Sequence, residues 1–138
     1  GTTDWNLAYN KTTTEITNRG ETIDAERERR IEDMTPDTRW NLSANHNMDA
    51  WRMLARVSSY SDWYDSNEGL DYSGEMVVDL ELSYNLNESS SVMLGGNNVL
   101  DEAGDTLHDA TDYGNKYSQF APMGFSGAFW YAKYSYNF

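Results

Sequence analysis

The chain has 138 residues, a formal net charge of −13, no cysteine and a mean hydropathy of −0.79. A hydrophobic fraction of 38% with 14% aromatics excludes a disordered acidic tail. Nucleic acid is an unsuitable partner, because no basic stripe is available to displace the counterions of a phosphate backbone. No apolar run reaches the roughly 18 residues of a transmembrane helix, although short alternating membrane strands are compatible with this composition. The opening GTTDWNLAYN lacks the features of a secretory signal, so we expect an intracellular protein or the later part of a longer chain.

The first predicted element is a strand over about 4–16, where apolar and polar residues alternate. A long polar loop over 17–38 follows, marked by Gly20, Pro36 and a dense mixture of Arg with Asp and Glu. A short helical piece is expected within it, around Ala25–Glu32.

The rest of the chain alternates between strands and connections. The predicted strands are 39–46, one starting at Trp51, 75–86, 91–100 and 125–138, with short turns near 46–50 and 86–90 and polar loops over 64–74 and 101–124. The total is six strands, joined alternately by short turns and long loops. This organisation is typical of an antiparallel meander in an outer-membrane barrel.

Each predicted strand has one apolar and one polar face. The clearest apolar face, in EMVVDLELSYNL, consists of Met76, Val78, Leu80, Leu82, Tyr84 and Leu86. The charged residues of the polar faces include Arg52, Arg56, Asp79, Glu81 and Lys133. An apolar face points to the core in a soluble β-protein, but to lipid in a membrane barrel, where the polar face lines a wet lumen.

Aromatic residues favour the membrane arrangement. Those at the short-turn ends are Trp5, Trp51, Tyr84, Tyr136 and Phe138, and those toward the long-loop ends are Trp40, Trp63 and Trp130. Two bands are typical of rings anchored at two membrane interfaces, whereas a packed core places rings anywhere along a strand. These residues are therefore predicted membrane-interface aromatics, and the charged residues above are predicted to face the lumen.

Three short motifs follow one another along the chain. They are Pro36 and Arg39 before NLS (Asn41–Ser43), NNVLD (Asn97–Asp101) and the terminal YSYNF (Tyr134–Phe138). Together they resemble the C-terminal barrel part of TonB-dependent outer-membrane receptors, over essentially the whole chain. The only departure noted is VL in place of the usual LF within the second motif.

The resemblance implies that residues 1–138 form the last six strands of a 22-stranded barrel, with the plug domain and the TonB-engaging motif upstream. It implies a bacterial outer-membrane location, extracellular long loops and uptake of a nutrient such as an iron-siderophore, cobalamin or oligosaccharide. The implied partners are outer-membrane lipid, TonB, the barrel-assembly machinery and that ligand. Six strands are fewer than the usual membrane-barrel minimum of about eight, so we expect a fragment.

The last strand, GAFWYAKYSYNF, carries a more specific signal. Trp130, Tyr134, Tyr136 and Phe138 lie on one face, and a final Phe after such alternation resembles the signal that directs outer-membrane proteins to barrel insertion. A lipid-facing strand would show the same pattern, and one face can serve both purposes.

Candidate chemical sites are weak, and we expect no enzyme, cofactor or metal. GFSGA (Gly124–Ala128) lacks the second Gly of the nucleophile elbow GxSxG. His46, expected in a turn, and His108, expected in a loop, have no partner at metal-ligand spacing.

Two clusters of charged residues are further candidates for ligand binding. Asp101, Glu102, Asp105, Asp109 and Asp112 offer oxygen ligands for Ca²⁺, but their spacing matches no EF-hand and favours a generally acidic loop. Arg27, Arg29 and Arg30 would suit an anionic ligand, but the interleaved Glu26, Glu28 and Glu32 favour mutual pairing.

An alternative hypothesis is a soluble acidic β-sandwich that binds carbohydrate through exposed Trp and Tyr, with Ca²⁺ as a further ligand. Dependence on detergent distinguishes it from a membrane barrel.

Overall fold

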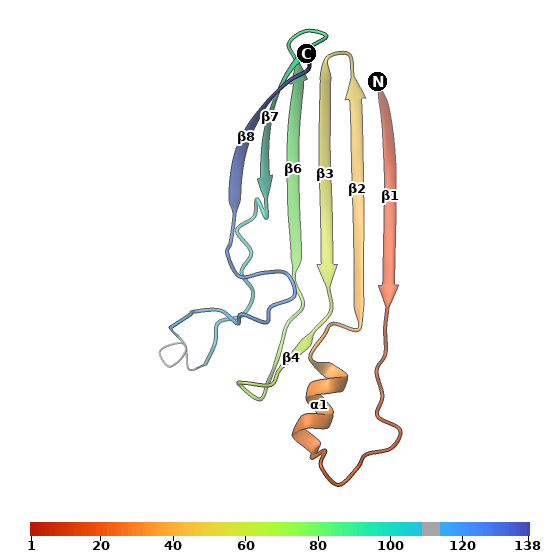
Figure 1. Cartoon of the computed structure of the whole chain (residues 1–138), viewed down its shortest axis with the longest axis vertical. Helices are drawn as coiled ribbons and strands as arrows, with labels where there is room; N and C mark the ends of the chain where they lie inside the picture. Colours follow the sequence, from red (N-terminus) through yellow and green to blue (C-terminus); the bar gives the residue numbers. More distant parts are fainter. Residues whose placement is uncertain (109–113) are drawn as a thin grey trace.

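A computed structural model describes residues 1–108 and 114–138 as an antiparallel β-protein (Figure 1). The sheet strands, in spatial order, are β1 (Thr2–Lys11), β2 (Thr38–Met48), β3 (Trp51–Tyr60), β6 (Met76–Asn85), β7 (Ser90–Asn97) and β8 (Phe129–Tyr136). A separate hairpin consists of β4 (Trp63–Asp65) and β5 (Leu70–Tyr72), and the helix of the described part is α1 (Ala25–Asp33). The predicted antiparallel meander is confirmed.

The connections are short at one end of the sheet and long at the other (Figure 1). Between β2 and β3, Asp49 adopts a φ of 50°, a left-handed conformation that Asp tolerates and that closes a tight turn. Residues 86–89 join β6 to β7, and the connections 12–37 and 61–75 lie at the opposite end, together with 98–108 and 114–128. The predicted alternation of short turns and long loops is therefore confirmed.

Helix α1 begins with a side-chain cap. The Asp24 carboxylate accepts a hydrogen bond from the Arg27 amide at 2.8 Å, which satisfies one of the free N–H groups of the first turn. Arg30 lies in the last turn, where a cation opposes the negative end of the helix dipole. The helix predicted over 25–32 is confirmed, extended by one residue.

Three predicted strand ends and two predicted assignments to loops or turns are wrong. The strand predicted over 91–100 ends at Asn97. The first strand ends at Lys11 rather than at 16, because the Thr12 amide turns to the Asp37 carbonyl at 2.8 Å. The last strand begins at Phe129 rather than at 125, after Gly127 with a φ of 69°. The loop predicted over 64–74 contains the β4–β5 hairpin, and His46 lies within β2 rather than in a turn.

The register keeps the apolar residues of all six strands in phase. Trp51 faces Tyr84, and one row across the sheet runs from Trp5 through Leu80 to Trp130. Since side chains alternate along every strand, in-phase pairing produces one continuous apolar face and one continuous polar face.

The same row shows that the strands are staggered. Trp5 lies six residues from the long-loop end of β1, whereas Trp130 lies one residue from that end of β8. A shift of about five residues over five strand steps corresponds to a strand tilt near 35°, given spacings of about 3.3 Å along and 4.8 Å between strands. That tilt is at the lower end of the range of about 35–45° found in closed barrels.

The sheet has no packed core of its own. Within the described residues the buried hydrophobic cluster consists of Trp63, Tyr72 and Leu107, with Phe120 and Ala121 packed against it, all outside the six-stranded sheet. A β-sandwich needs two sheets packed face to face, and here a single large sheet leaves its apolar face uncovered. The β-sandwich alternative is therefore wrong.

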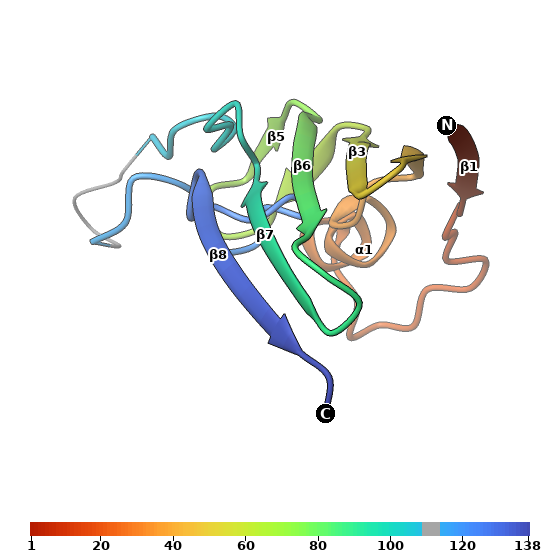
Figure 2. The same cartoon turned by 90° about the horizontal axis from the view of Figure 1, so that it is seen from above.

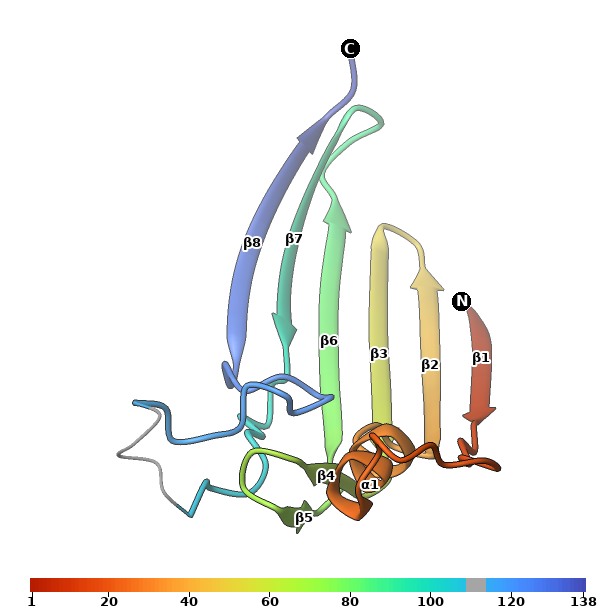
Figure 3. The ribbon, with the colours of Figure 1, turned by 60° about the horizontal axis from the view of Figure 1, so that its bottom comes forward.

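The strands follow an arc, and α1 lies on its concave side when the molecule is viewed from above (Figure 2). Helix α1, the β4–β5 hairpin and the connection after β7 gather at the long-loop end of the sheet (Figure 3). We call α1, β4, β5 and the described parts of 98–128 the loop cap. No helix in the described part is long and apolar enough to cross a membrane.

Candidate functional site: two sheet faces and a loop cap

Large apolar side chains are exposed across one face of the sheet. Trp5 is 68% exposed, Leu94 64% and Tyr134 61%, on strands at both edges and between them. Monomeric soluble proteins rarely expose contiguous apolar patches larger than a few hundred Å², and such patches mark contact with another protein or with lipid.

The aromatic residues predicted for this face are arranged toward its two ends. At the short-turn end Trp51 and Tyr84 lie 4.5 Å apart between ring centroids, and Tyr136 meets Phe138 edge to face at 5.1 Å. At the other end Trp40 pairs across β1 and β2 with Tyr9, which the prediction did not include.

Trp63 does not belong to this set. It is 4% exposed and stacks on Tyr72 at 5.3 Å in the loop cap, so its prediction as an interface aromatic is wrong. The strand ends at Tyr60, and the alternation that continues to Trp63 belongs to the hairpin.

Two adjacent glycines allow β8 to place an aromatic ring over each face of β7. A Cβ on Gly96 would lie 2.8 Å from the Trp130 ring, and one on Gly95 would lie 2.3 Å from the Tyr131 ring. Tyr131 crosses β7 above Gly95 and donates its hydroxyl to Glu81 on β6 at 2.7 Å. Rings that cover strand glycines in this way fix the strand register.

The predicted lumen residues all lie on the polar face. Arg56 approaches Asp79 at 3.8 Å, and Arg52 donates to Asn45 at 2.8 Å. The Lys133 ammonium group has no hydrogen bond or ion pair to other described residues. The face is thus a cross-strand polar network rather than a set of separate charges.

At the long-loop end, residues of the polar face and of the loop cap together line a hollow. The hollow there is lined by Arg39, Asn41, Arg56, Ser58, Tyr60, Val77, Asp79, Asn97, Asn98, Met123, Gly124, Ser126, Gly127 and Phe129. Asp79 also accepts the Asn98 amide at 2.9 Å, which ties the start of the last long connection to β6. Asp101 accepts the Ala128 amide at 2.8 Å, which joins the two ends of that connection to each other.

The motif residues have identifiable structural tasks. Arg39, in the first motif, stacks over the Tyr60 ring at 4.9 Å. Asn98, in the second, has a φ of 50° and exchanges hydrogen bonds with the backbone of Glu102. GFSGA lies in the connection before β8, and its Gly127 has a positive φ.

The interior of the loop cap contains a fully buried carboxylate. Asp65 is 1% exposed, accepts the Ser118 hydroxyl and the Asn67 amide, and so links the hairpin to the following connection. Hydrogen bonds of this kind offset the cost of burying a charge. Burial raises the pKa of the neighbouring Tyr72 phenol, with the Glu68 charge as a second cause.

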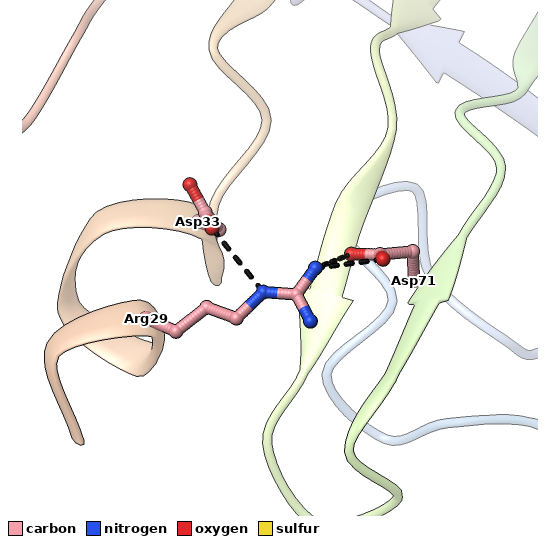
Figure 4. Close-up of polar contacts among 3 residues, drawn as sticks. All are labelled: Arg29, Asp33 and Asp71. Carbon is pink, nitrogen blue, oxygen red and sulfur yellow. Dashed lines mark hydrogen bonds and ion pairs between the residues drawn. The ribbon is translucent and has the colours of Figure 1, made fainter. Parts of the chain in front are cut away.

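A single arginine docks α1 on the hairpin (Figure 4). Arg29 donates to both carboxylate oxygens of Asp71 at 2.5 and 2.7 Å and to Asp33 at 3.4 Å. Its guanidinium also stacks over the Tyr64 ring at 4.2 Å. The Asp71 carboxylate raises the pKa of Arg29, which therefore remains charged. One guanidinium nitrogen, Nη2, contacts both Asp71 oxygens, Nε contacts Asp33, and the planar group covers the Tyr64 ring, a combination that lysine does not reproduce.

Two glutamates of α1 make their contacts outside the helix. Glu28 binds Arg19 at 2.6 Å, and Glu32 accepts the Ile16 amide at 2.7 Å. The predicted mutual pairing of the helix arginines with Glu26, Glu28 and Glu32 is therefore wrong.

Carboxylates also gather where β6 meets the loop cap. Burial raises the pKa of Glu75, and the charges of Glu102 and Asp105 raise it further. Glu102 accepts the amides of Ala103 and Gly104, and Asp105 accepts the Ser73 amide at 2.9 Å.

Of the predicted calcium ligands, Asp109 and Asp112 lie outside the described residues. Within the described ranges no group of three or more His, Cys, Asp or Glu side chains is placed to hold a metal ion. His46 accepts or donates a hydrogen bond at 2.7 Å with Thr3, and His108 is exposed.

The sequence did not reveal the Arg29 contact, because Tyr64 and Asp71 lie far along the chain within a segment that resembles an irregular polar loop. The alternation of LDY after Gly69, which has a φ of 67°, was the available signal for a hairpin.

No protein-family model and no curated protein matches the chain. Among solved structures, it is similar to the ferric-catecholate import receptor Fiu from E. coli K12 in its closed form, with a TM-score of 0.65 and 18% sequence identity. The similarity covers 96% of this chain and 19% of that receptor. At this identity it shows the fold: the six-stranded sheet with its loop cap has the arrangement of a segment of that receptor.

Proposed function

We propose that residues 1–138 are the C-terminal barrel part of a TonB-dependent outer-membrane receptor that imports a nutrient. The observation that carries this proposal is the continuous apolar face, exposed and in register over six strands with a polar network behind it. In water such a face favours aggregation, whereas in a bilayer it is solvated by lipid. The strand tilt and the structural similarity to Fiu support the same conclusion.

Each region has a role in this proposal. The apolar face contacts lipid, with rings such as Trp51 and Tyr136 at one interface and Trp40 and Trp130 at the other. The polar face lines the lumen, and the loop cap lies outside the cell and contributes to ligand capture. No bond is made or broken during import, so we propose no catalytic residue and no cofactor.

The edges of the sheet need further strands. Both β1 and β8 have one unpaired side, and unpaired strand edges are not tolerated in lipid. We propose that earlier strands of the same longer chain close the barrel and that a plug domain in that chain engages TonB. We also propose that the barrel-assembly machinery recognises the last strand through Trp130, Tyr134, Tyr136 and Phe138.

Site-directed labelling tests the orientation of the faces. The segment has no native cysteine, so single cysteines can be introduced at Leu82 on the apolar face and at Ser83 on the polar face. In outer-membrane vesicles of cells that produce the full-length protein, we expect a lipid-soluble quencher to affect a probe at Leu82→Cys and spare the one at Ser83→Cys. Equal quenching at both positions would contradict the proposal, as would absence of the protein from the outer-membrane fraction.

A nutrient-uptake assay tests the transport role. The full-length gene is deleted, and growth is compared on ferric catecholates, ferric hydroxamates, cobalamin and oligosaccharides as limiting nutrients. We expect one class to be lost, with the same loss after deletion of TonB. Unchanged growth on every class would contradict the transport role but leave the barrel fold intact.

A further inference from the structure

A hollow lies between α1 and the turn of the β4–β5 hairpin. Its lining residues are Asp24, Glu26, Arg27, Arg30, Ile31, Met34 and Ser66. The Arg29 contacts with Asp71 and Tyr64 hold the two walls at a fixed separation, so the hollow is defined by the fold rather than by a free helix.

Two cations on one wall have no direct ion pair to a described residue, although the carboxylates of Asp24 and Glu26 line the same hollow. In the described part of the chain, the guanidinium groups of Arg27 and Arg30 have no hydrogen bond or ion pair, in contrast to Arg29. A spacing of three residues places them side by side on one helix face. Together they offer a pair of planar donors, the geometry that suits carboxylate and phosphate oxygens.

The opposite wall contains an unsatisfied hydroxyl. The Ser66 Oγ is buried and has no hydrogen-bond partner within the described residues. A buried polar group without a partner carries a desolvation cost, which an acceptor oxygen of a ligand would relieve. Ser66 and both arginines line the same hollow.

The other lining residues narrow the class of ligand. One carboxylate oxygen of Asp24 is engaged by the Arg27 amide, while Glu26 is exposed at the rim. Ile31, 46% exposed, adds an apolar surface next to the cations. This combination suits an organic anion that also has hydroxyl groups to donate to a carboxylate, more than a bare inorganic ion.

We propose that this hollow binds a small polyanionic hydroxy acid or a chemically similar chelate, whose carboxylate oxygens contact Arg27 and Arg30. The inference deepens the proposed transport function, because α1 lies on the concave side of the sheet, toward the axis of the proposed barrel (Figure 2). It makes the helix a direct part of ligand capture.

Citrate is a suitable probe, and the full-length protein in detergent micelles is the sample. We expect citrate binding, measured by isothermal titration calorimetry, to weaken at least about tenfold in the double variant Arg27→Gln and Arg30→Gln, since charge-assisted hydrogen bonds are lost. Ser66→Ala should weaken it about two- to tenfold, from one neutral hydrogen bond. Gln retains most of the helix propensity of Arg, so α1 should persist.

The matched control removes the same charge elsewhere. Lys11→Gln with Lys116→Gln lowers the net charge equally but leaves the hollow intact. An equal loss of citrate affinity in the two double variants would mean that the effect comes from long-range electrostatics, and it would overturn the proposed site. Undetectable citrate binding to the unmodified protein, or binding of neutral raffinose with equal affinity, would also overturn it.

The outcome is separable from that of the transport proposal. Outer-membrane fractionation and the quenching experiment do not depend on Arg27 or Arg30. If the protein passes those tests but does not bind citrate, the proposed citrate site is refuted and the barrel proposal stands. If it fails those tests and still binds citrate, the barrel proposal is refuted and the citrate site stands. Hydrogen exchange of the α1 amides verifies that each variant keeps the helix docked.

Discussion

The sheet and the loop cap differ in where their apolar side chains lie. The sheet exposes Trp5, Leu94 and Trp130 by more than 60% each, whereas the loop cap buries Trp63 and Tyr72 to 6% exposure or less. Ordinarily the strands of a β-protein contain the core and its loops are solvated. The reversal is what the proposed membrane function requires, with the sheet surrounded by lipid and the loop cap surrounded by water.

Truncation of the loop-cap core should give the largest effect. Trp63→Ala removes the ring that stacks on Tyr72, and large-to-small core changes of this kind cost about 3–5 kcal/mol. We expect the loss to be local, with faster hydrogen exchange in β4, β5 and α1 and little change in β6 or β7. Uniform loss of protection across the sheet would show that the two regions are one cooperative unit.

A charge on the apolar face should come next. Leu80→Arg places a cation near the middle of β6, where lipid-exposed Arg costs about 2–4 kcal/mol in membrane barrels. Urea unfolding in lipid vesicles measures the change. Ser83→Arg, on the polar face of the same strand, is the control and should change stability by less than about 1 kcal/mol. A larger effect at Ser83 would invert the assignment of the faces.

Gly95→Ala tests the ring that crosses β7. The added methyl group would displace Tyr131 from Gly95 and break its bond to Glu81, at a cost of about 1–2 kcal/mol. In a Tyr131→Ala background the same change should be nearly neutral. Additive effects in this double-mutant cycle would mean that the glycine acts through the backbone instead.

Arg29→Lys should have a smaller and strictly local effect. Lysine keeps the charge but cannot contact Asp71 and Asp33 through separate nitrogens or stack a planar group on Tyr64. We expect faster hydrogen exchange in α1, with β4 and β5 unchanged. Arg19→Lys, which alters another ion pair of the same helix, serves as the control.

The smallest effect should be a pH dependence at the junction of the two regions. Burial raises the pKa of Glu75 in the folded protein, so the folded state holds this proton more tightly than the unfolded one. The contribution of protonated Glu75 to folding stability is therefore complete below the ordinary Glu pKa. It is lost as the pH rises through the raised pKa of the folded state. Glu75→Gln should raise the thermal midpoint of the loop cap, followed by near-ultraviolet circular dichroism, at pH 7 but not at pH 4. An equal shift at both pH values would exclude titration of Glu75 as the cause.

Much of the sheet was predictable because a period of two and a one-sided apolar pattern constrain register strongly. The strand containing Leu80 was placed to within a residue at each end, and all five predicted polar-face residues lie on one face. The loop cap was not predictable to the same degree. Trp63 continues the spacing of the preceding strand across a break after Tyr60, and no local residue reveals that its partner is Tyr72.

The contacts of the candidate ligand site were hidden for a related reason. Charge spacing along α1 suggested pairing within the helix, but Arg29 has a longer contact with Asp33 in the helix and shorter ones with Asp71, 42 positions away. Local charge patterns predict contacts between helical neighbours. They give no information on which distant segment folds against the helix, and that segment determines which arginines remain available.

The order of strands in the sheet is the order of strands in the sequence, from β1 to β8. Every strand of the large sheet therefore hydrogen-bonds only to the sheet strands that precede and follow it in the chain, with β4 and β5 set aside in their own hairpin. No strand has to be inserted between two others. A wall of this kind can grow or shrink by one hairpin at a time without disturbing the pairings already made. It can also form progressively from one edge, with each new hairpin templated by the strand laid down before it.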